Sequence, residues 1–95
     1  MTRIMVALIF VAMSACSFAA ERSSAAVREF KRAAPCPETG VIRGACPGWQ
    51  VDHIVPLCAG GVDTPANMQW LLVEDHKVKT RVDVRACRAQ RKQEN

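Results

Sequence analysis

Residues 51–61 read Val51-Asp52-His53-Ile54-Val55-Pro56-Leu57-Cys58-Ala59-Gly60-Gly61. An aspartate and a histidine are neighbours here, in a stretch where Val51, His53 and Val55 alternate with other residues as in a β-strand. Alternation sends adjacent side chains to opposite faces, so Asp52 and His53 can serve one site only where the strand twists or ends. Pro56 favours such an end, since proline interrupts a strand ladder.

The flanking segments predict the order strand, loop, strand, helix. We expect strands over residues 49–55 and 67–72, separated by a long loop that contains Gly60-Gly61 and Thr64-Pro65. A helix is expected from about Glu74 to at least Arg81, because acidic residues suit its first turn and an apolar stripe follows. That stripe is made by Val78, Val82 and Ala86. Alternatively, Asp83 begins a separate short helix.

Residues 23–48 predict one more helix and a loop. Ser23-Ser24 can cap a helix over residues 25–33, which Pro35 ends. Glycines and prolines then interrupt any regular pattern over residues 36–48. The sequence shows no repeat and no second domain, so we expect one small α+β domain.

Residues 1–19 are expected to be a signal peptide. A short basic start precedes an apolar run over residues 4–13, and small residues follow it. A small-x-small pattern ends at Ala19, and cleavage there would leave residues 20–95 as an exported domain, periplasmic or secreted. The alternative is a lipoprotein signal of residues 1–15, after which an acylated Cys16 would anchor the protein to a membrane.

Cysteines are the expected staples of this domain, because a chain of this size buries little apolar surface. Four of them follow the signal, and an even number in an exported chain predicts two disulfides. Of three possible pairings we favour Cys36–Cys46, which closes a short loop, and Cys58–Cys87, which ties the central loop to the C-terminal segment. Structural zinc is the rival, but gaps of ten, twelve and twenty-nine residues contain no Cys-x-x-Cys pair.

The segment 46–80 resembles the HNH endonucleases, which are nucleases of the ββα-metal type. The resemblance depends on a combination of motifs, because a short motif alone matches by chance. The matching residues are Asp52-His53, Pro56-Leu57, Gly60-Gly61, Asn67-Met68-Gln69, His76 and Lys79-Thr80. The resemblance implies a ββα-metal core with an N-terminal helix, stapled by disulfides as in the small exported members of the group.

The resemblance also assigns roles at the site. His53 is expected to be the general base, and a neutral imidazole suits that task near pH 7. Asp52 and His76 are the expected metal ligands. Asn67 is the second residue of the catalytic group, whose amide would hold the long loop and help fix the ring of His53. Exported members do not always keep the last histidine, so the resemblance leaves a second option for this chain, in which Asp52, water and substrate hold the metal and His76 is a bystander.

The implied activity is metal-dependent hydrolysis of phosphodiester bonds in nucleic acid, with DNA favoured and little sequence specificity. Mg²⁺ is the expected ion, with Mn²⁺, Ni²⁺ or Zn²⁺ as substitutes, and no small-molecule cofactor is expected. Seven basic and two acidic residues follow from position 77 onward, within a chain of net charge +4. Lys77, Lys79 and Arg81 are therefore the expected contacts to the nucleic-acid backbone.

Two alternatives remain open at this point: a non-catalytic exported module that binds nucleic acid, and an envelope lipoprotein. The chain also departs from the wider family. Many intracellular members carry Cys-x-x-Cys knuckles, and Leu72-Val73-Glu74-Asp75 occupies the place of the second one here. We therefore expect disulfides where those members hold structural zinc.

Overall fold

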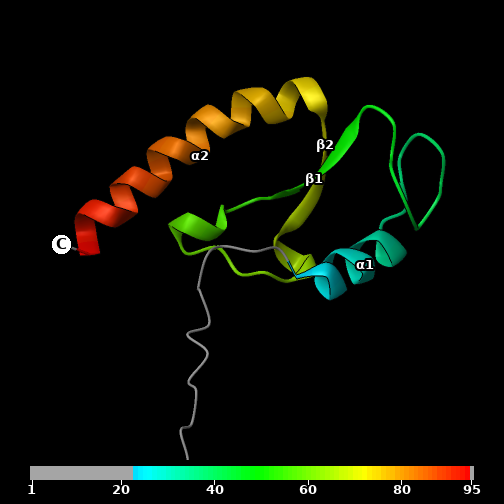
Figure 1. The fold of residues 1–95 in the computed structure, drawn as a ribbon, viewed down its shortest axis with the longest axis horizontal. Helices are drawn as coiled ribbons and strands as arrows, with labels where there is room; N and C mark the ends of the chain where they lie inside the picture. Colours follow the sequence, from blue (N-terminus) through cyan, green and yellow to red (C-terminus); the bar gives the residue numbers. More distant parts are fainter. Residues whose placement is uncertain (1–22, 95) are drawn as a thin grey trace, which may run out of the picture.

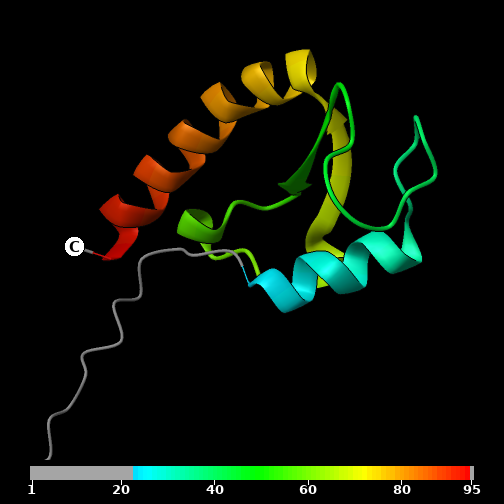
Figure 2. The same ribbon diagram turned by 45° about the vertical axis from the view of Figure 1, so that its right-hand side comes forward.

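A two-stranded antiparallel hairpin lies between two helices in the part of the chain that the structure describes, residues 23–94 (Figure 1). The structure is a computed structural model. Its elements, in chain order, are α1 (Ser24–Ala33), β1 (Trp49–His53), the 3-10 turns η1 (Leu57–Ala59) and η2 (Pro65–Asn67), β2 (Met68–Leu72) and α2 (Val73–Glu94). Figures 1 and 2 show α1 and α2 on opposite sides of the hairpin. The predicted α+β class is confirmed.

The hairpin is shorter than the sequence pattern predicted. β1 ends at His53, and β2 begins at Met68, which is the partner of His53 in the register. The reason is Asn67, whose carbonyl accepts from Ile54 N at 2.8 Å and whose side chain binds both backbone groups of Val55. A side chain therefore replaces the strand ladder from Val55 onward, and the loop can leave the sheet there.

Helix α1 forms the hydrophobic core with one face of the hairpin. The Oγ atom of Ser23 caps the helix by accepting from Ala26 N, which confirms the predicted start to within one residue. Phe30 packs 5.7 Å from the ring of Trp70, and the indole N–H of Trp70 donates to Ala34 O at 2.7 Å. Buried side chains from α1, β1 and β2 complete this core: Ala26, Phe30, Val51 and Met68.

Helix α2 is continuous from Val73 to Glu94, so a separate helix from Asp83 does not form. The expected apolar stripe is also wrong as a buried face, because Val78 and Val82 are 61% and 57% exposed. The face turned toward β1 and η1 is instead mostly polar, and its residues lie three or four positions apart. They are His76, Lys79, Thr80, Asp83 and Cys87.

Both disulfides have the pairing that we favoured from the sequence. Cys36–Cys46 closes the loop after α1, and Cys58–Cys87 joins η1 to α2, with Cα atoms 5.6 and 5.2 Å apart. Neither helix of residues 23–94 combines the length and the apolar character that a bilayer crossing requires. The predicted signal peptide, its cleavage site and the acylation of Cys16 lie outside the described residues.

The Cys58–Cys87 disulfide is expected to contribute about 3.6 kcal/mol to the free energy of unfolding, because it closes a loop of 29 residues in the unfolded chain. The double variant Cys58→Ser, Cys87→Ser should lose that amount in urea unfolding of the oxidised protein. Cys36→Ser, Cys46→Ser is the matched control, with a ten-residue loop and a smaller expected loss. Equal losses, or none, would contradict this account.

Candidate functional site

A solvent-accessible cavity of about 390 Å³ lies between β1, η1 and α2. Its walls combine the polar end of β1 with the polar face of α2, and the Cys58–Cys87 disulfide and Arg91 also line it. Of the residues predicted from the sequence, the cavity brings together Asp52, His53 and His76. Residues far apart in the chain therefore meet in one concave site, as catalytic and binding groups usually do.

Asp52 is a buried carboxylate whose two oxygens have different neighbours. Its exposed fraction is 3%, and Oδ2 accepts from Gln69 Nε2 at 3.0 Å, across the hairpin. The same oxygen lies 3.0 Å from the ammonium of Lys79. The other oxygen, Oδ1, lies 3.6 Å from His76 Nε2, where α2 passes over the strand. Asp52 thus faces a cation on one side and an imidazole on the other.

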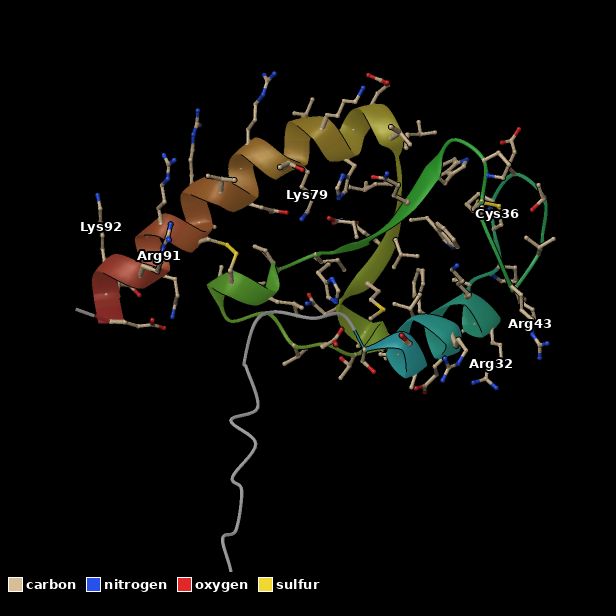
Figure 3. The ribbon with its side chains drawn as sticks, in the orientation of Figure 1. Arg32, Cys36, Arg43, Lys79, Arg91 and Lys92 are labelled. Atoms are coloured by element: carbon tan, nitrogen blue, oxygen red, sulfur yellow. A yellow bond between two sulfur atoms is a disulfide. The ribbon has the colours of Figure 1, made fainter. Side chains whose placement is uncertain are left out.

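Lys79 extends from α2 toward the sheet instead of into solvent (Figure 3). Its ammonium donates to the carbonyl of His53 at 2.7 Å and to both oxygens of Asp83, at 3.0 and 2.7 Å. Burial disfavours the charged amine, but the hydrogen bonds and the charges of Asp83 and Asp52 outweigh this and raise the pKa of Lys79 above its ordinary value. Lys79 is therefore a cation that holds two carboxylates, whereas Lys77 and Arg81 lie on the exposed surface of α2.

His53 is buried, with 4% of its surface exposed, and its ring is held by the long loop. Nε2 lies 2.8 Å from Oδ1 of Asp63. The other oxygen of this carboxylate, Oδ2, accepts a hydrogen bond from the backbone N–H of Ser23. A carboxylate only accepts hydrogen bonds, so the neutral ring donates its Nε2–H and keeps the lone pair on Nδ1. Within the described residues, no hydrogen bond joins the side chains of His53 and Asp52, although both residues line the cavity.

Asn67 joins the two ends of the long loop. Its amide oxygen accepts from Val55 N at 2.9 Å, and its amide nitrogen donates to the carbonyls of Val55 at 2.9 Å and Val62 at 2.8 Å. The side chain is buried and hydrogen-bonded at both ends, which fixes the loop close to the end of β1. Asp63, which holds the ring of His53, follows Val62 directly, so Asn67 acts on His53 through this loop.

Asp52 and His76 are the side chains of the cavity that could hold a cation. Oδ1 of Asp52 and Nε2 of His76 are 3.6 Å apart, while two ligands each about 2.1 Å from one ion stand about 3 Å apart at right angles. A small movement of the His76 side chain, which is 27% exposed, would close that gap. Residues 23–94 contain no cluster of three or more His, Cys, Asp or Glu side chains that could enclose a metal.

Asp63 and Asp83 are site residues that the sequence reasoning missed. Asp63 lies ten residues beyond His53, inside the loop between the two glycines and Pro65, and Asp83 lies four residues beyond Lys79 on α2. The signal for Asp83 was present, because a lysine and an aspartate four residues apart share one helix face. The path of the loop that brings Asp63 to His53 has no comparable local signal.

Comparisons of the chain with models of protein families, with curated proteins and with solved structures found no match. A buried carboxylate that faces an imidazole can bind a divalent cation, and a second imidazole held in one tautomer can accept a proton. Both capabilities meet at one cavity open to solvent.

Proposed function

We propose that this protein is a metal-dependent HNH-type endonuclease that hydrolyses phosphodiester bonds of nucleic acid, with DNA as the preferred substrate and little sequence specificity. One observation carries the proposal. Asp52 Oδ1 faces His76 Nε2 at 3.6 Å, in the cavity that is also lined by His53 with its ring held by Asp63. The motif resemblance assigned the same three residues to one site.

His53 is the proposed general base of the reaction. With its Nε2–H donated to Asp63, the ring offers the Nδ1 lone pair to a water molecule that attacks the phosphorus. The carboxylate of Asp63 stabilises the ring once it is protonated, as in other carboxylate–histidine pairs. Asn67 keeps the loop that carries Asp63 in place, and so acts as a positioning residue.

Asp52 and His76 are the proposed ligands of a divalent ion, with Mg²⁺ as the working ion and Mn²⁺, Ni²⁺ or Zn²⁺ as substitutes. When bound, such an ion supplies positive charge next to the phosphate oxygens on which negative charge develops. Gln69 and Lys79 hold the second oxygen of Asp52 and so orient the carboxylate. Lys77 and Arg81 remain on the outer surface of α2, available to the nucleic-acid backbone.

We further propose that the protein acts outside the cytoplasm, periplasmic or secreted. Two disulfides in a domain of this size are compatible with an oxidising compartment. An anchored form through Cys16 would place the same domain at a membrane. Mass spectrometry of the mature N-terminus distinguishes these forms, because acylation adds the mass of the lipid to a chain that begins at Cys16.

Removal of the metal is the direct test of the proposed activity. We expect the oxidised, processed protein to convert supercoiled plasmid to the nicked form with Mg²⁺ or Mn²⁺, and to stop when a chelator is added in excess. Restoring the metal should restore nicking, which excludes irreversible loss of the fold. Nicking that persists in the chelator, or its absence with every divalent ion tested, would contradict the proposal.

A non-catalytic module that binds nucleic acid is the second candidate, and the ammonium of Lys79 favours it. This group lies 3.0 Å from the carboxylate that the nuclease needs as a metal ligand, so a cation already neutralises part of the site. Both candidates bind DNA in a salt-dependent manner. Only the nuclease converts the plasmid, so the nicking assay separates the two.

A further inference from the structure

A second hollow, of about 430 Å³, lies between α1 and the loop that the Cys36–Cys46 disulfide closes. It is separate from the cavity between β1 and α2, and the two share no lining residue. Its lining is positively charged and contains no acidic side chain; we call it the cationic groove. Its residues are Val27, Arg28, Lys31, Arg32, Ile42, Arg43 and Gly44. Figure 3 shows Arg32 and Arg43 at the same corner of the molecule, away from α2.

The fold holds these charges together. Arg28, Lys31 and Arg32 are three and four positions apart on α1, so they share one face of the helix. Lys31 donates to the carbonyl of Gly44 at 3.0 Å, which ties the disulfide loop to α1 and places Arg43 opposite the helix. The ammonium of Lys31 also lies 6.0 Å from the ring of Trp70, in the core. The groove is thus built by a helix, a disulfide and a hydrogen bond.

The guanidinium groups of the cationic groove form no ion pair with an acidic side chain within residues 23–94. The ion pairs of these residues have other basic partners, namely His53, His76, Lys77 and Lys79. Four like charges around one hollow repel one another, and an anion that enters it removes this repulsion. Guanidinium is planar and donates in a fork that matches two phosphate oxygens. Three of the four cations are arginines, so the groove suits phosphate better than an isolated carboxylate.

We propose that the cationic groove binds the phosphate backbone of nucleic acid and forms a second contact region apart from the cleavage site. The inference rests on the proposed nucleic-acid substrate. The concave shape and the arginine content favour a phosphate backbone over a membrane surface. Val41 and Ile42 of this loop are exposed, at 44% and 40%. Two apolar side chains are fewer than the apolar face that a membrane-inserting surface presents.

Arginine protection tests the groove directly. The chain would carry His53→Gln so that it does not cut the DNA. It would be modified with phenylglyoxal in the presence and in the absence of a 20-base-pair DNA duplex, and mass spectrometry would identify the modified arginines. We expect the duplex to protect Arg28, Arg32 and Arg43. Full modification of all three at saturating duplex would overturn the proposal. So would protection by vesicles of phosphatidylglycerol in place of protection by DNA.

Salt dependence provides the second readout. The variant Arg28→Gln, Arg32→Gln, Arg43→Gln leaves Lys31 to hold the loop, and should weaken duplex binding about tenfold or more at low salt. The slope of log Kd against log salt should fall by about two to three, close to one for each phosphate contact removed. The matched control replaces the same arginines with lysine and should keep most of the slope. An unchanged Kd and slope in the glutamine variant would contradict the proposal that the groove binds nucleic acid.

The outcome separates this inference from the proposed function. A protein that nicks plasmid but leaves the three arginines unprotected is a nuclease without this contact region. If the protein never nicks plasmid but the duplex protects the three arginines, the protein has the contact region and lacks the proposed activity. Neither the protection measurement nor the salt dependence of binding requires cleavage, so each proposal can fail alone.

Discussion

Replacing His53 with alanine should lower the rate of plasmid nicking by about 10²- to 10⁴-fold, the range over which a positioned general base accelerates a reaction. The physical reason is the loss of the proton acceptor for the attacking water, while Asp52 and His76 stay in place on β1 and α2. The measurement is the single-turnover conversion of supercoiled plasmid with saturating Mg²⁺.

Because His53 is buried against Asp63, the alanine variant also removes a hydrogen bond that supports the loop. His53→Gln is the control, since its side-chain amide can still donate to Asp63 but cannot accept a proton near neutral pH. We expect the glutamine variant to keep the thermal stability of the wild type and to be as inactive as the alanine variant. A glutamine variant that nicks at the wild-type rate would show that His53 only supports the loop.

The local parts of the fold could be predicted from the sequence. Ser23 and Pro35 bound a helix by capping and by steric exclusion, and both effects operate within one turn. The disulfides followed from the number and spacing of the cysteines. The order strand, loop, strand, helix followed from periodicity, although the strands ended early because the side chain of Asn67 replaces part of the ladder.

The inward face of α2 could not be predicted from an apolar stripe. The rule that a helix buries its apolar face failed because Val78 and Val82 point to solvent, while Lys79 and Asp83 face the strand. Charged side chains are usually solvated, and the partial burial of Lys79 is acceptable here because two carboxylates and a carbonyl surround its ammonium. That partnership depends on how α2 crosses β1, which is a tertiary property.

The candidate site, too, could be predicted from the sequence only in part. The motif identified Asp52, His53 and His76, and the structure places all three along one cavity. Alternation along the strand predicted that Asp52 and His53 would leave on opposite faces, and their side chains indeed have different partners, Gln69 and Asp63. The site combines them because β1 ends at His53.

Asp52→Asn should reduce the affinity for Mn²⁺, used as the probe ion, by at least about tenfold and abolish nicking. Replacement of an outer partner of a metal ligand already costs roughly 10- to 100-fold in affinity, so loss of the anionic ligand itself should cost no less. The shape of the side chain is conserved, and the hydrogen bond from Gln69 can persist on the amide oxygen. Isothermal titration calorimetry of the oxidised protein measures the affinity.

Asp83→Asn is the matched control, because it removes a negative charge from the other carboxylate that contacts Lys79. Asp83 contacts Lys79 at 2.7 Å, as Asp52 does at 3.0 Å. Within the described residues, of the two carboxylates only Asp52 pairs with His76, at 3.6 Å. If the ion binds between Asp52 Oδ1 and His76 Nε2, the Asp83 variant keeps an affinity close to that of the wild type. Equal losses in the two variants would instead place the ion where the ammonium of Lys79 now lies, between both carboxylates. Unchanged affinity in the Asp52 variant would remove Asp52 from the metal site altogether, and with it the argument that His76 is its partner ligand.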